Sequence, residues 1–376
     1  MASPTFSDRI ERIPASGIRE VFDAAGEDAI NLGLGQPDFP APNHAREAAV
    51  EAIRAGRADG YTPNRGIKPL REAIVAKHER DQGVEIDTDD VIATAGGSEA
   101  LHLALEAHVG DGDEVLVPDP GFVSYAALTT LTGAEPVSVP LREDLTIDPA
   151  AIEDAITEDT RAFIVNSPAN PTGAVASPED VEEFARIARE HDVLCISDEV
   201  YEYTVFEGEH RSPMEFDAGG NVVVVHSVSK LYSMTGWRLG WVTAESERID
   251  RMLRIHQYVQ ACASAPAQFA AEAALTGDQS IVEEMTASFE RRRDLLLDGF
   301  AEIGLECATP SGAFYAMPKV PDGFIEECLD RGVVIVPGEA FGDHGEGYAR
   351  ISYATDEAEL EEALSVMGAA YDAVVE

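Results

Sequence analysis

From about residue 89 onward, short apolar runs alternate with longer segments that repeat apolar residues at helical spacing. The four consecutive valines Val222 to Val225 are typical of a buried parallel strand, because β-branched residues stand there between polar neighbours. This alternation predicts an α/β fold with a doubly wound, mostly parallel sheet between helices. The predicted strands are residues 91–93, 114–117, 162–165, 193–196, 222–225 and 239–243.

Helical periodicity predicts several helices and a second domain. Residues 43–55 form a predicted helix with Asn43 as its N-cap, and further predicted helices are 69–81, 98–107 and 178–190. After Gln279 a long amphipathic helix leaves the sheet, followed by strand-like residues 312–317, 333–336 and 348–352 and a helix over 356–375. We therefore predict an N-terminal segment 1–42 packing with the small domain, a large domain 43–280, and a small α+β domain 281–376.

The charge of the chain indicates the salt concentration in which this fold works. The formal net charge is −43, yet 45% of residues are hydrophobic, so disorder is a poor explanation. Acidic residues are spread along the chain, and their mutual repulsion is screened by salt. Together with the scarcity of lysine, this predicts a protein of a very salty cytoplasm, as in a halophile. The lysines are Lys68, Lys77, Lys230 and Lys319.

The same charge argues against nucleic acid or an anionic membrane as a partner. No apolar run approaches the roughly 18 residues of a membrane span, and the N-terminus has no apolar signal region. The cysteines lack CxxC spacing and are expected to be reduced core thiols of a cytoplasmic protein. They are Cys195, Cys262, Cys307 and Cys328. Any anionic ligand must then be held by a local cationic site.

Lys230 follows the valine strand at the sheet edge where open α/β folds bind ligands. Lysine can lose its proton and form a Schiff base with a carbonyl, which arginine cannot. A solvated loop lysine is the simpler interpretation of Lys230 taken alone. Its neighbours Ser227, Ser229 and Arg238 add hydroxyls and a guanidinium at the same edge.

Other loops after predicted strands carry candidate ligand groups, each with a simpler alternative. Gly97 and Ser98 open a helix and can hold a phosphate, or they form an ordinary N-cap. Phe122 is either a core residue or a stacking face. Asn170 lies in SPANPTG, which is also explained as a rigid turn.

Asp198 and Tyr201 lie in SDEVY, directly after the buried run 193–196. A buried acid needs a partner, so Asp198 is either a helix N-cap or the partner of a cationic ring nitrogen. Arg350 lies within a predicted strand of the small domain and needs an anion, either structural or a substrate carboxylate. The nine histidines show no metal-ligand spacing, and no P-loop or GxSxG elbow occurs, so no metal is proposed.

The ordered set of motifs resembles fold-type I pyridoxal-phosphate enzymes, specifically the class I/II aminotransferases of the aspartate aminotransferase family. The motifs are YTPNRGIKPLREAI, GGSEAL, SPANPTG, SDEVYEY, SVSKLYSMTGWRLGW, PSGAFY and ARISYAT. They span the chain from about residue 31 to residue 355 in the family's order. The resemblance implies a large domain with a mostly parallel seven-stranded sheet between helices, and a smaller α+β domain.

The resemblance also implies a role for each candidate residue. Lys230 forms a Schiff base with pyridoxal 5'-phosphate and then serves as general base and acid. Asp198 keeps the pyridine nitrogen protonated, and Phe122 stacks on the ring. The implied ligands of the ring's phenolic oxygen are Asn170 and Tyr201, and those of the phosphate are Gly97, Ser98, Ser227 and Arg238.

Two further roles concern the substrate and a second subunit. Arg350, Asn170 and the backbone of Gly35 are implied to hold the substrate α-carboxylate. Tyr61 is implied to reach the phosphate of a neighbouring subunit, which predicts a homodimer with shared active sites. Two positions depart from the commonest pattern of the family. They are Ala169, where many relatives have Asn, and Phe122, where many have Tyr or Trp.

We therefore predict a ping-pong aminotransferase that moves an amino group from an L-amino acid to a 2-oxo acid, with aspartate and 2-oxoglutarate as the first expectation. Aromatic and alanine-type aminotransferases remain open, as does a C–S lyase or decarboxylase, because the cofactor loops serve all these reactions. A non-catalytic regulatory protein is disfavoured by the intact set around Lys230. Arg65 is either a contact for a substrate side-chain carboxylate or, more simply, an exposed arginine beside a glycine.

Overall fold

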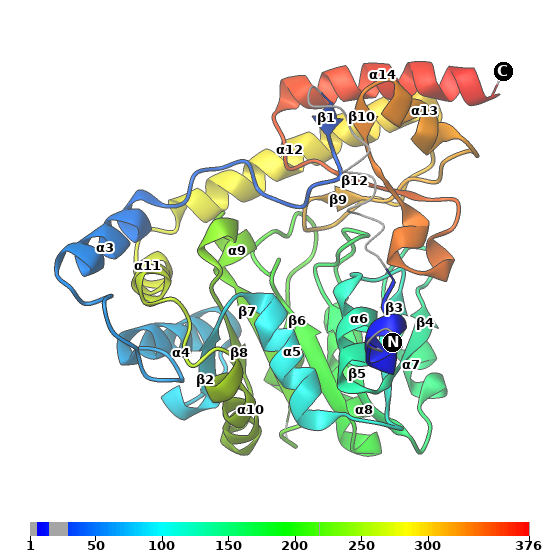
Figure 1. The fold of residues 1–376 in the computed structure, drawn as a ribbon. Helices are drawn as coiled ribbons and strands as arrows, with labels where there is room; N and C mark the ends of the chain where they lie inside the picture. The colour runs from blue at the N-terminus through cyan, green and yellow to red at the C-terminus, as the bar shows by residue number, and fades with distance from the viewer. Residues whose placement is uncertain (1–5, 15–28, 218, 376) are drawn as a thin grey trace, which may run out of the picture.

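The computed structural model describes residues 6–14, 29–217 and 219–375. Its centre is a seven-stranded sheet in the order β2-β8-β7-β6-β5-β3-β4 (Figure 1). Neighbouring strands are parallel except that β8 runs antiparallel to β2 and β7. The strands are β2 (Val91–Thr94), β3 (Glu114–Asp119), β4 (Glu135–Pro140), β5 (Thr160–Asn166), β6 (Leu194–Asp198), β7 (Val222–Ser227) and β8 (Gly240–Thr243). The prediction of a doubly wound, mostly parallel sheet is confirmed.

The hydrophobic pattern predicted six of these seven strands and missed β4. This strand lies at the sheet edge, and of its residues only Val139 is buried. It also contains Pro136 and Pro140, which lack the N–H that a central strand donates. An exposed edge strand carries no continuous apolar run, so periodicity alone does not reveal it.

Helices cover both faces of the sheet, and this explains the valine run of β7. Val223 and Val225 pack into the core beneath α5 and α10, whereas Val222 and Val224 pack into the core on the α8 side. Both faces of β7 are therefore buried. The main helices of this layer are α3 (Asn43–Arg54), α4 (Lys68–Gln82), α5 (Gly97–His108), α6 (Ser124–Thr132), α7 (Pro149–Ala155), α8 (Pro178–His191), α10 (Ser246–Val259) and α11 (Ala265–Thr276).

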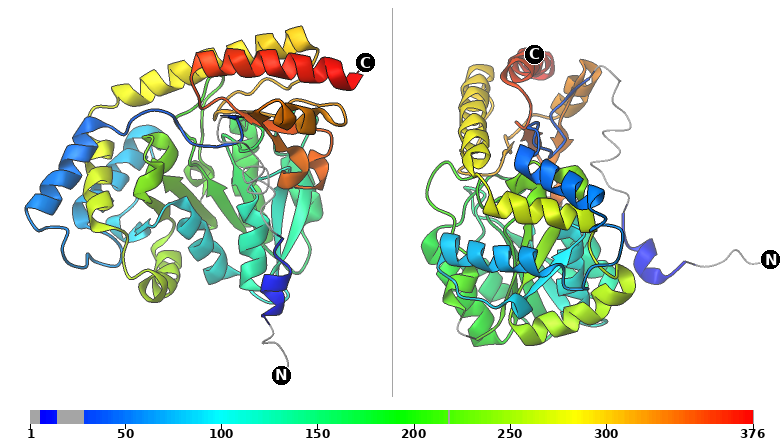
Figure 2. Two further views of the ribbon diagram at one scale, coloured as in Figure 1. Left: turned by 45° about the horizontal axis from the view of Figure 1, so that its top comes forward. Right: turned by 90° about the vertical axis from the view of Figure 1, so that its left-hand side faces the viewer.

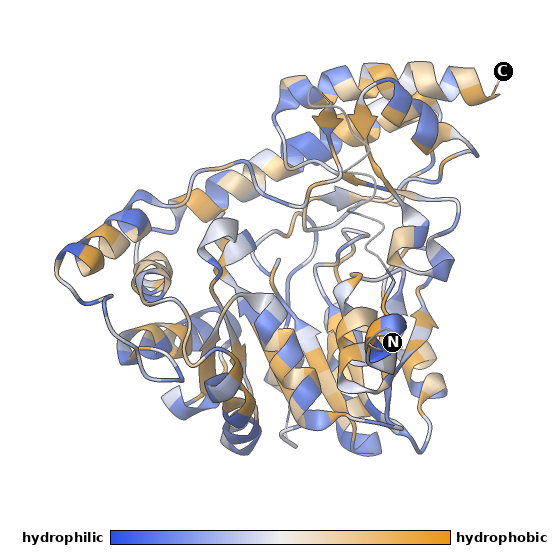
Figure 3. Cartoon of the chain, viewed as in Figure 1, coloured by the Kyte–Doolittle hydropathy of each residue, from blue (hydrophilic) through white to orange (hydrophobic). Residues whose placement is uncertain are grey.

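The predicted helices occur at the expected places, and one predicted cap is wrong. Asn43 is the first residue of α3, and the N-cap position is held by Pro42 without a side-chain hydrogen bond. The side chain of Asn43 instead accepts a hydrogen bond from Arg46, one turn further on. Colouring by hydropathy shows apolar strands and two-faced helices (Figure 3), as the amphipathic pattern predicted.

The C-terminal part forms a second layer above the sheet. The long helix α12 (Ser280–Ile303) lies beside α14 (Glu357–Val375), as two views agree (Figure 2). A three-stranded antiparallel sheet has the order β11-β12-β9, with β11 (Val336–Pro337), β12 (Ala349–Ser352) and β9 (Tyr315–Ala316). The expected strand 333–336 is divided, because β10 (Val333–Val334) belongs to a different sheet from β11. The remaining helix is α13 (Phe324–Asp330).

The described N-terminal residues contact both layers. Strand β1 (Ile30–Asn31) pairs in parallel with β10, and Leu32 lies in the core of the upper layer. Helix α1 (Asp8–Glu11) lies near α6 instead, where Arg9 donates to the carbonyl of Leu131 over 3.1 Å. The division into segments 1–42, 43–280 and 281–376 stays a prediction, and residues 15–28 lie outside the described part.

Two smaller sequence expectations can be compared with the fold. All four cysteines are free, but only Cys195 and Cys328 are buried, whereas Cys262 and Cys307 are partly exposed. Among the described helices, none combines the length and the apolar character that crossing a membrane requires.

Candidate active site

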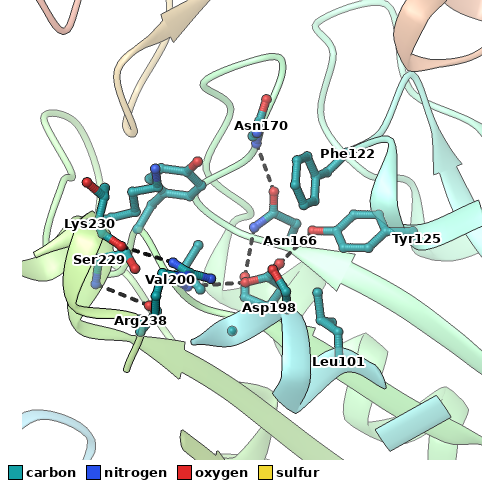
Figure 4. Close-up of a pocket in the computed structure, with 15 residues that line it drawn as sticks. Leu101, Phe122, Tyr125, Asn166, Asn170, Asp198, Val200, Ser229, Lys230 and Arg238 are labelled. Atoms are coloured by element: carbon teal, nitrogen blue, oxygen red, sulfur yellow. Dashed lines mark hydrogen bonds between the residues drawn. The ribbon is translucent and has the colours of Figure 1, made fainter. Parts of the chain in front are cut away.

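A cavity of about 180 Å³ opens at the carboxyl ends of the parallel strands (Figure 4). Strands β5, β6 and β7 each deliver their last residue to it, which is where open α/β sheets bind ligands. The cavity is lined by most of the site residues predicted from the sequence: Gly97, Ser98, Phe122, Asn170, Asp198, Tyr201, Ser227, Lys230 and Arg238. The others are Leu101, Tyr125, Asn166, Val200, Ser229 and Thr235.

Lys230 supplies an amine with an altered pKa. It lies on the short helix α9 (Val228–Leu231), which starts directly after β7, and its Nζ donates to the carbonyl of Gly35. Burial, together with the charges of Arg350 and Arg238, lowers the pKa of Lys230 to about 8. The neutral and nucleophilic form is therefore far more accessible near neutral pH than for a solvated lysine.

Asp198 supplies a buried carboxyl at the end of β6. Its Oδ2 accepts a hydrogen bond from the hydroxyl of Tyr125 over 2.9 Å. Burial raises the pKa of Asp198 to about 6, and the hydrogen bond from Tyr125 opposes that rise. No described cationic side chain forms an ion pair with this carboxyl, so a cationic ligand would relieve its desolvation. The alternative of a helix N-cap is wrong, because Asp198 is followed by turns.

The start of α5 and Arg238 together form an anion-binding corner. Gly96 precedes α5 with a φ of 84°, and a Cβ there would lie 2.7 Å from Nη2 of Arg238. Glycine thus lets the guanidinium approach the free N–H groups of the helix start. The carbonyl of Thr235 accepts from Nη1 of Arg238 over 3.0 Å, and no described carboxylate pairs with this arginine. The hydroxyl of Ser227 lines the same cavity and donates to the carbonyl of Leu239 over 3.1 Å.

Polar and apolar side chains complete the walls of the cavity. Tyr201 and Tyr315 share a hydrogen bond of 3.0 Å between their hydroxyls, and burial raises the pKa of Tyr201 well above its ordinary value. The side chains of Phe122 and Val200 add apolar surface. Phe122 packs edge-on against the ring of Tyr125 with 5.6 Å between centroids. A flat heteroaromatic ligand would find both apolar faces and hydrogen-bonding edges here.

Arg350 comes from β12 of the upper layer and is 3% exposed. Its Nη1 donates to Oδ1 of Asn170 over 3.1 Å, and its Nη2 donates to the carbonyl of Gly33. The guanidinium also lies over the rings of Tyr315 and Phe341, at 4.8 and 4.7 Å from their centroids. Arg350 forms no ion pair with any described carboxylate. The anion that a buried arginine needs is thus not supplied by the described part of the chain, so Arg350 is available for the carboxylate of a ligand.

Gly35 lies where the chain passes close to Tyr315. A Cβ at this position would be 2.0 Å from the hydroxyl of Tyr315, so any larger residue would displace the ring. The carbonyl of Gly35 accepts from Lys230, and the carbonyl of Gly33 accepts from Arg350. One backbone segment therefore contacts both the pocket lysine and the buried arginine.

Four sequence candidates do not line the cavity. Gly35 and Arg350 contact its lining residues Lys230 and Asn170, whereas Tyr61 and Arg65 lie elsewhere. Tyr61 is 92% exposed and does not line the cavity. Arg65 is neither a cavity residue nor the exposed arginine that was expected, because its guanidinium binds Asp250 and the carbonyl of Asp89. That pairing removes Arg65 as a free contact for a substrate carboxylate.

Sequence reasoning missed Tyr125 and Asn166. Tyr125 is the second residue of α6 and lies three residues after Phe122, and this short spacing is the only indication in the sequence that both belong to one site. Asn166 ends β5; its Nδ2 donates to the carbonyl of Asp198 and its Oδ1 accepts from the backbone N–H of Asn170, both over 2.8 Å. It thus joins two neighbouring loops of the site.

Comparison with known proteins agrees with this geometry. The family Aminotransferase class I and II matches residues 27–367. The chain is 41% identical over 372 residues to a probable aspartate aminotransferase of Methanocaldococcus jannaschii, covering 96% of this chain and 98% of that protein. It is also 41% identical over 379 residues to aromatic-amino-acid aminotransferase 2 of Thermococcus litoralis, covering 96% and 97% of the two chains. The structure of aspartate aminotransferase from Thermus thermophilus with maleate has the same fold, with a TM-score of 0.94, 37% identity and coverage of 98% and 100%.

Proposed function

The chain belongs to the class I and II aminotransferase family, and we propose that it uses pyridoxal 5'-phosphate to move an amino group from an L-amino acid to a 2-oxo acid. The observation that carries this proposal is the arrangement of Lys230, Asp198 and Arg238 around one cavity. Aspartate with 2-oxoglutarate is the first substrate pair, because several relatives at about 40% identity are named aspartate aminotransferases. The aromatic alternative rests on a relative and a solved structure that are named for aromatic amino acids or as an aromatic aminotransferase.

The donor set of the cavity fits pyridoxal phosphate at each chemically distinct part of that molecule. Lys230 offers an amine that can react with the aldehyde. The carboxylate of Asp198 has no cationic partner of its own among the described residues and can pair with the ring nitrogen. The cradle at Gly96 with Arg238 suits the phosphate, and Ser227 and Ser98 lie beside it. Asn170 and Tyr201 suit the phenolic oxygen, and Phe122 suits the ring face. When bound, this cofactor supplies an electron sink for the bond cleaved at the substrate Cα.

The residues of the chain then have separate tasks. Arg350 binds the substrate α-carboxylate through two parallel N–H groups and fixes the orientation of Cα. Lys230 moves a proton to and from Cα through Nζ, since a pKa of about 8 lets it act as base and acid near neutral pH. Asp198 stays ionised opposite a cationic nitrogen, because that charge compensates the cost of its burial. The alternating use of donor and acceptor predicts ping-pong kinetics.

A half-reaction tests the proposal directly. The protein is loaded with pyridoxal phosphate in molar salt and mixed with one amino acid at a time, without an acceptor, while the cofactor absorbance is followed. We expect aspartate and glutamate to change the absorbance of the bound cofactor, and we expect Lys230→Ala to abolish this change. Lys319→Ala is the matched control, because Lys319 is an exposed lysine away from the cavity.

Other outcomes would redirect the assignment. Conversion by aromatic or small apolar amino acids alone would keep the aminotransferase and replace the substrate pair. Release of ammonia and a 2-oxo acid from a sulfur amino acid without any acceptor would indicate a C–S lyase. Near-normal conversion by Lys230→Ala would refute the role of this lysine.

We further propose that the enzyme is a homodimer in a salty cytoplasm, with Tyr61 of each subunit reaching the phosphate of the other. The exposure of Tyr61 is compatible with this role, because its side chain, at 92% exposure, is accessible to a second subunit. Sedimentation at high salt would give the mass of a dimer. If Tyr61 acts across the interface, Tyr61→Phe would weaken binding of pyridoxal phosphate while the dimer persists.

A further inference from the structure

A buried ion pair lies behind the active site, outside the cavity itself. Lys77 of α4 is completely buried, and its Nζ lies 2.7 Å from Oε2 of Glu202. Asp81 is a second and more exposed partner at 3.3 Å. In a chain with four lysines, Lys77 is thus placed in the interior. The tasks described above for the cavity residues leave this pair unexplained.

Glu202 is the chain neighbour of Tyr201, and the two side chains point in opposite directions. Tyr201 lines the cavity, whereas Glu202 pairs with Lys77 of α4. The backbone between β6 and residue 204 forms turns without the repeated hydrogen bonds of a helix or strand. Only isolated bonds hold it, such as Glu202 N to Glu199 O at 3.1 Å and Thr204 N to Tyr201 O at 2.8 Å. The side chains of this segment therefore contribute much of its anchoring.

Both glutamates of this segment are held on the side away from the cavity. Oε1 of Glu202 lies 3.4 Å from Nε2 of His226, and the ring of His226 stacks on Trp241 at 5.1 Å between centroids. Glu199 binds His210 at 3.1 Å and accepts from the hydroxyl of Ser212 over 2.7 Å. The 3.4 Å contact between Glu202 and His226 is not a hydrogen bond. The segment is thus tied to α4 by Glu202, to the loop that carries residues 210–212 by Glu199, and to β7 by the N–H of Glu199, which donates to the carbonyl of Val225 over 2.9 Å.

Net stabilisation is a weak explanation for this pair. Removing two charges from water costs about as much as their attraction returns, so an apolar pair of similar size often serves stability as well. An ion pair instead fixes one geometry, because a shifted carboxylate would leave a buried ammonium without a partner. The residue whose place is fixed most directly is Tyr201, one peptide bond from Glu202.

We propose that Lys77 and Glu202 are positioning residues that hold the hydroxyl of Tyr201 in its place at the active site. This proposal rests on the proposed aminotransferase function. When the pair is broken, the turn relaxes, and the hydroxyl of Tyr201 loses its alignment. Misplacement of a catalytic contact by about 1 Å can cost roughly 100-fold in rate.

A double-mutant cycle tests this mechanism. The rate and substrate dependence of the half-reaction are measured for Glu202→Gln, Tyr201→Phe and the combined variant, together with the absorbance of the bound cofactor. We expect Glu202→Gln to lower the rate by roughly 10- to 100-fold with little change in the half-saturating substrate concentration. In the Tyr201→Phe background the same substitution should have almost no further effect, because the hydroxyl it positions is gone. Multiplicative losses in the combined variant would overturn the proposal.

Glu202→Gln leaves Lys77 charged and unpaired, so a second variant is needed in case the first does not fold. Lys77→Met combined with Glu202→Gln removes both charges, and its rate loss should likewise disappear in the Tyr201→Phe background. A full rate in this doubly neutral variant would also overturn the proposal. Lys68→Met on the same helix is the matched control, because Lys68 is largely exposed and, among the described residues, pairs only with Glu72. A wild-type enzyme without any half-reaction would refute the proposed function instead.

Discussion

The hydroxyl of Tyr125 should set the pH range in which the enzyme retains its cofactor. It donates to Oδ2 of Asp198 over 2.9 Å, and it is the one side-chain hydrogen bond that opposes the effect of burial on this carboxyl. Asp198 has a pKa of about 6, raised above its ordinary range by desolvation. Tyr125→Phe removes the donor but retains the ring that packs on Phe122. The change therefore isolates one hydrogen bond.

The expected shift can be estimated from the energy of that bond. A hydrogen bond to a charged group contributes about 1.5–3 kcal/mol, and each pKa unit corresponds to about 1.36 kcal/mol. Loss of the donor should raise the pKa of Asp198 by roughly one to two units, to about 7 or 8. The carboxyl would then be protonated near neutral pH and could no longer pair with a protonated ring nitrogen.

The assay is the dissociation constant of pyridoxal phosphate as a function of pH. We expect wild-type affinity to fall as the pH drops through about 6, the pKa of Asp198. In Tyr125→Phe the same fall should begin roughly one to two units higher. A cofactor analogue without the ring nitrogen serves as control, since its binding should not depend on Tyr125. An unchanged or lowered midpoint in Tyr125→Phe would refute this reasoning.

Further predictions concern Lys230, Arg350 and the acidic surface. Burial lowers the pKa of Lys230 to about 8, so the rate of cofactor attachment should rise with pH and level off above about 8; a rise continuing towards 10.5 would contradict the lowered value. Arg350→Gln should raise the KM for amino acids and 2-oxo acids by roughly 10- to 100-fold, through loss of charged hydrogen bonds, and an unchanged KM would exclude its carboxylate role. Dialysis from molar to low salt should reduce resistance to urea, because acidic repulsion is no longer screened; full stability at low salt would contradict the halophilic interpretation.

The fold could be predicted from the sequence wherever burial on both faces leaves an apolar run. Strand β7 is the clearest example, since Val222 to Val225 serve cores on its two sides. The edge strand β4 has only one buried residue and therefore gives no such pattern. The divided strands β10 and β11 could not be separated, because the apolar run from Val333 to Val336 does not reveal which sheet each half joins.

The candidate site was predicted mainly from ordered motifs, and its missing members are defined by three-dimensional contact. Tyr125 is distinguished from any buried tyrosine only by its bond to Asp198, 73 positions away. The pairing of Lys77 with Glu202 spans 125 positions and involves residues outside the predicted site. Arg65 shows the converse. Its residue type and loop suit a contact with a substrate carboxylate, but its guanidinium already pairs with Asp250. Spacing along a chain identifies chemical groups, whereas their partners depend on packing.

The environment of Arg350 has a consequence for small anions. Its guanidinium is bound by the amide oxygen of Asn170, the carbonyl of Gly33 and two aromatic rings, and no described carboxylate neutralises it. We therefore expect chloride to bind at the position proposed for the substrate carboxylate. At the high salt that would screen the acidic surface, we expect chloride and substrate to compete for this arginine. If molar salt stabilises the fold, as proposed, we expect the highest rate at a salt concentration below the one that gives the greatest stability.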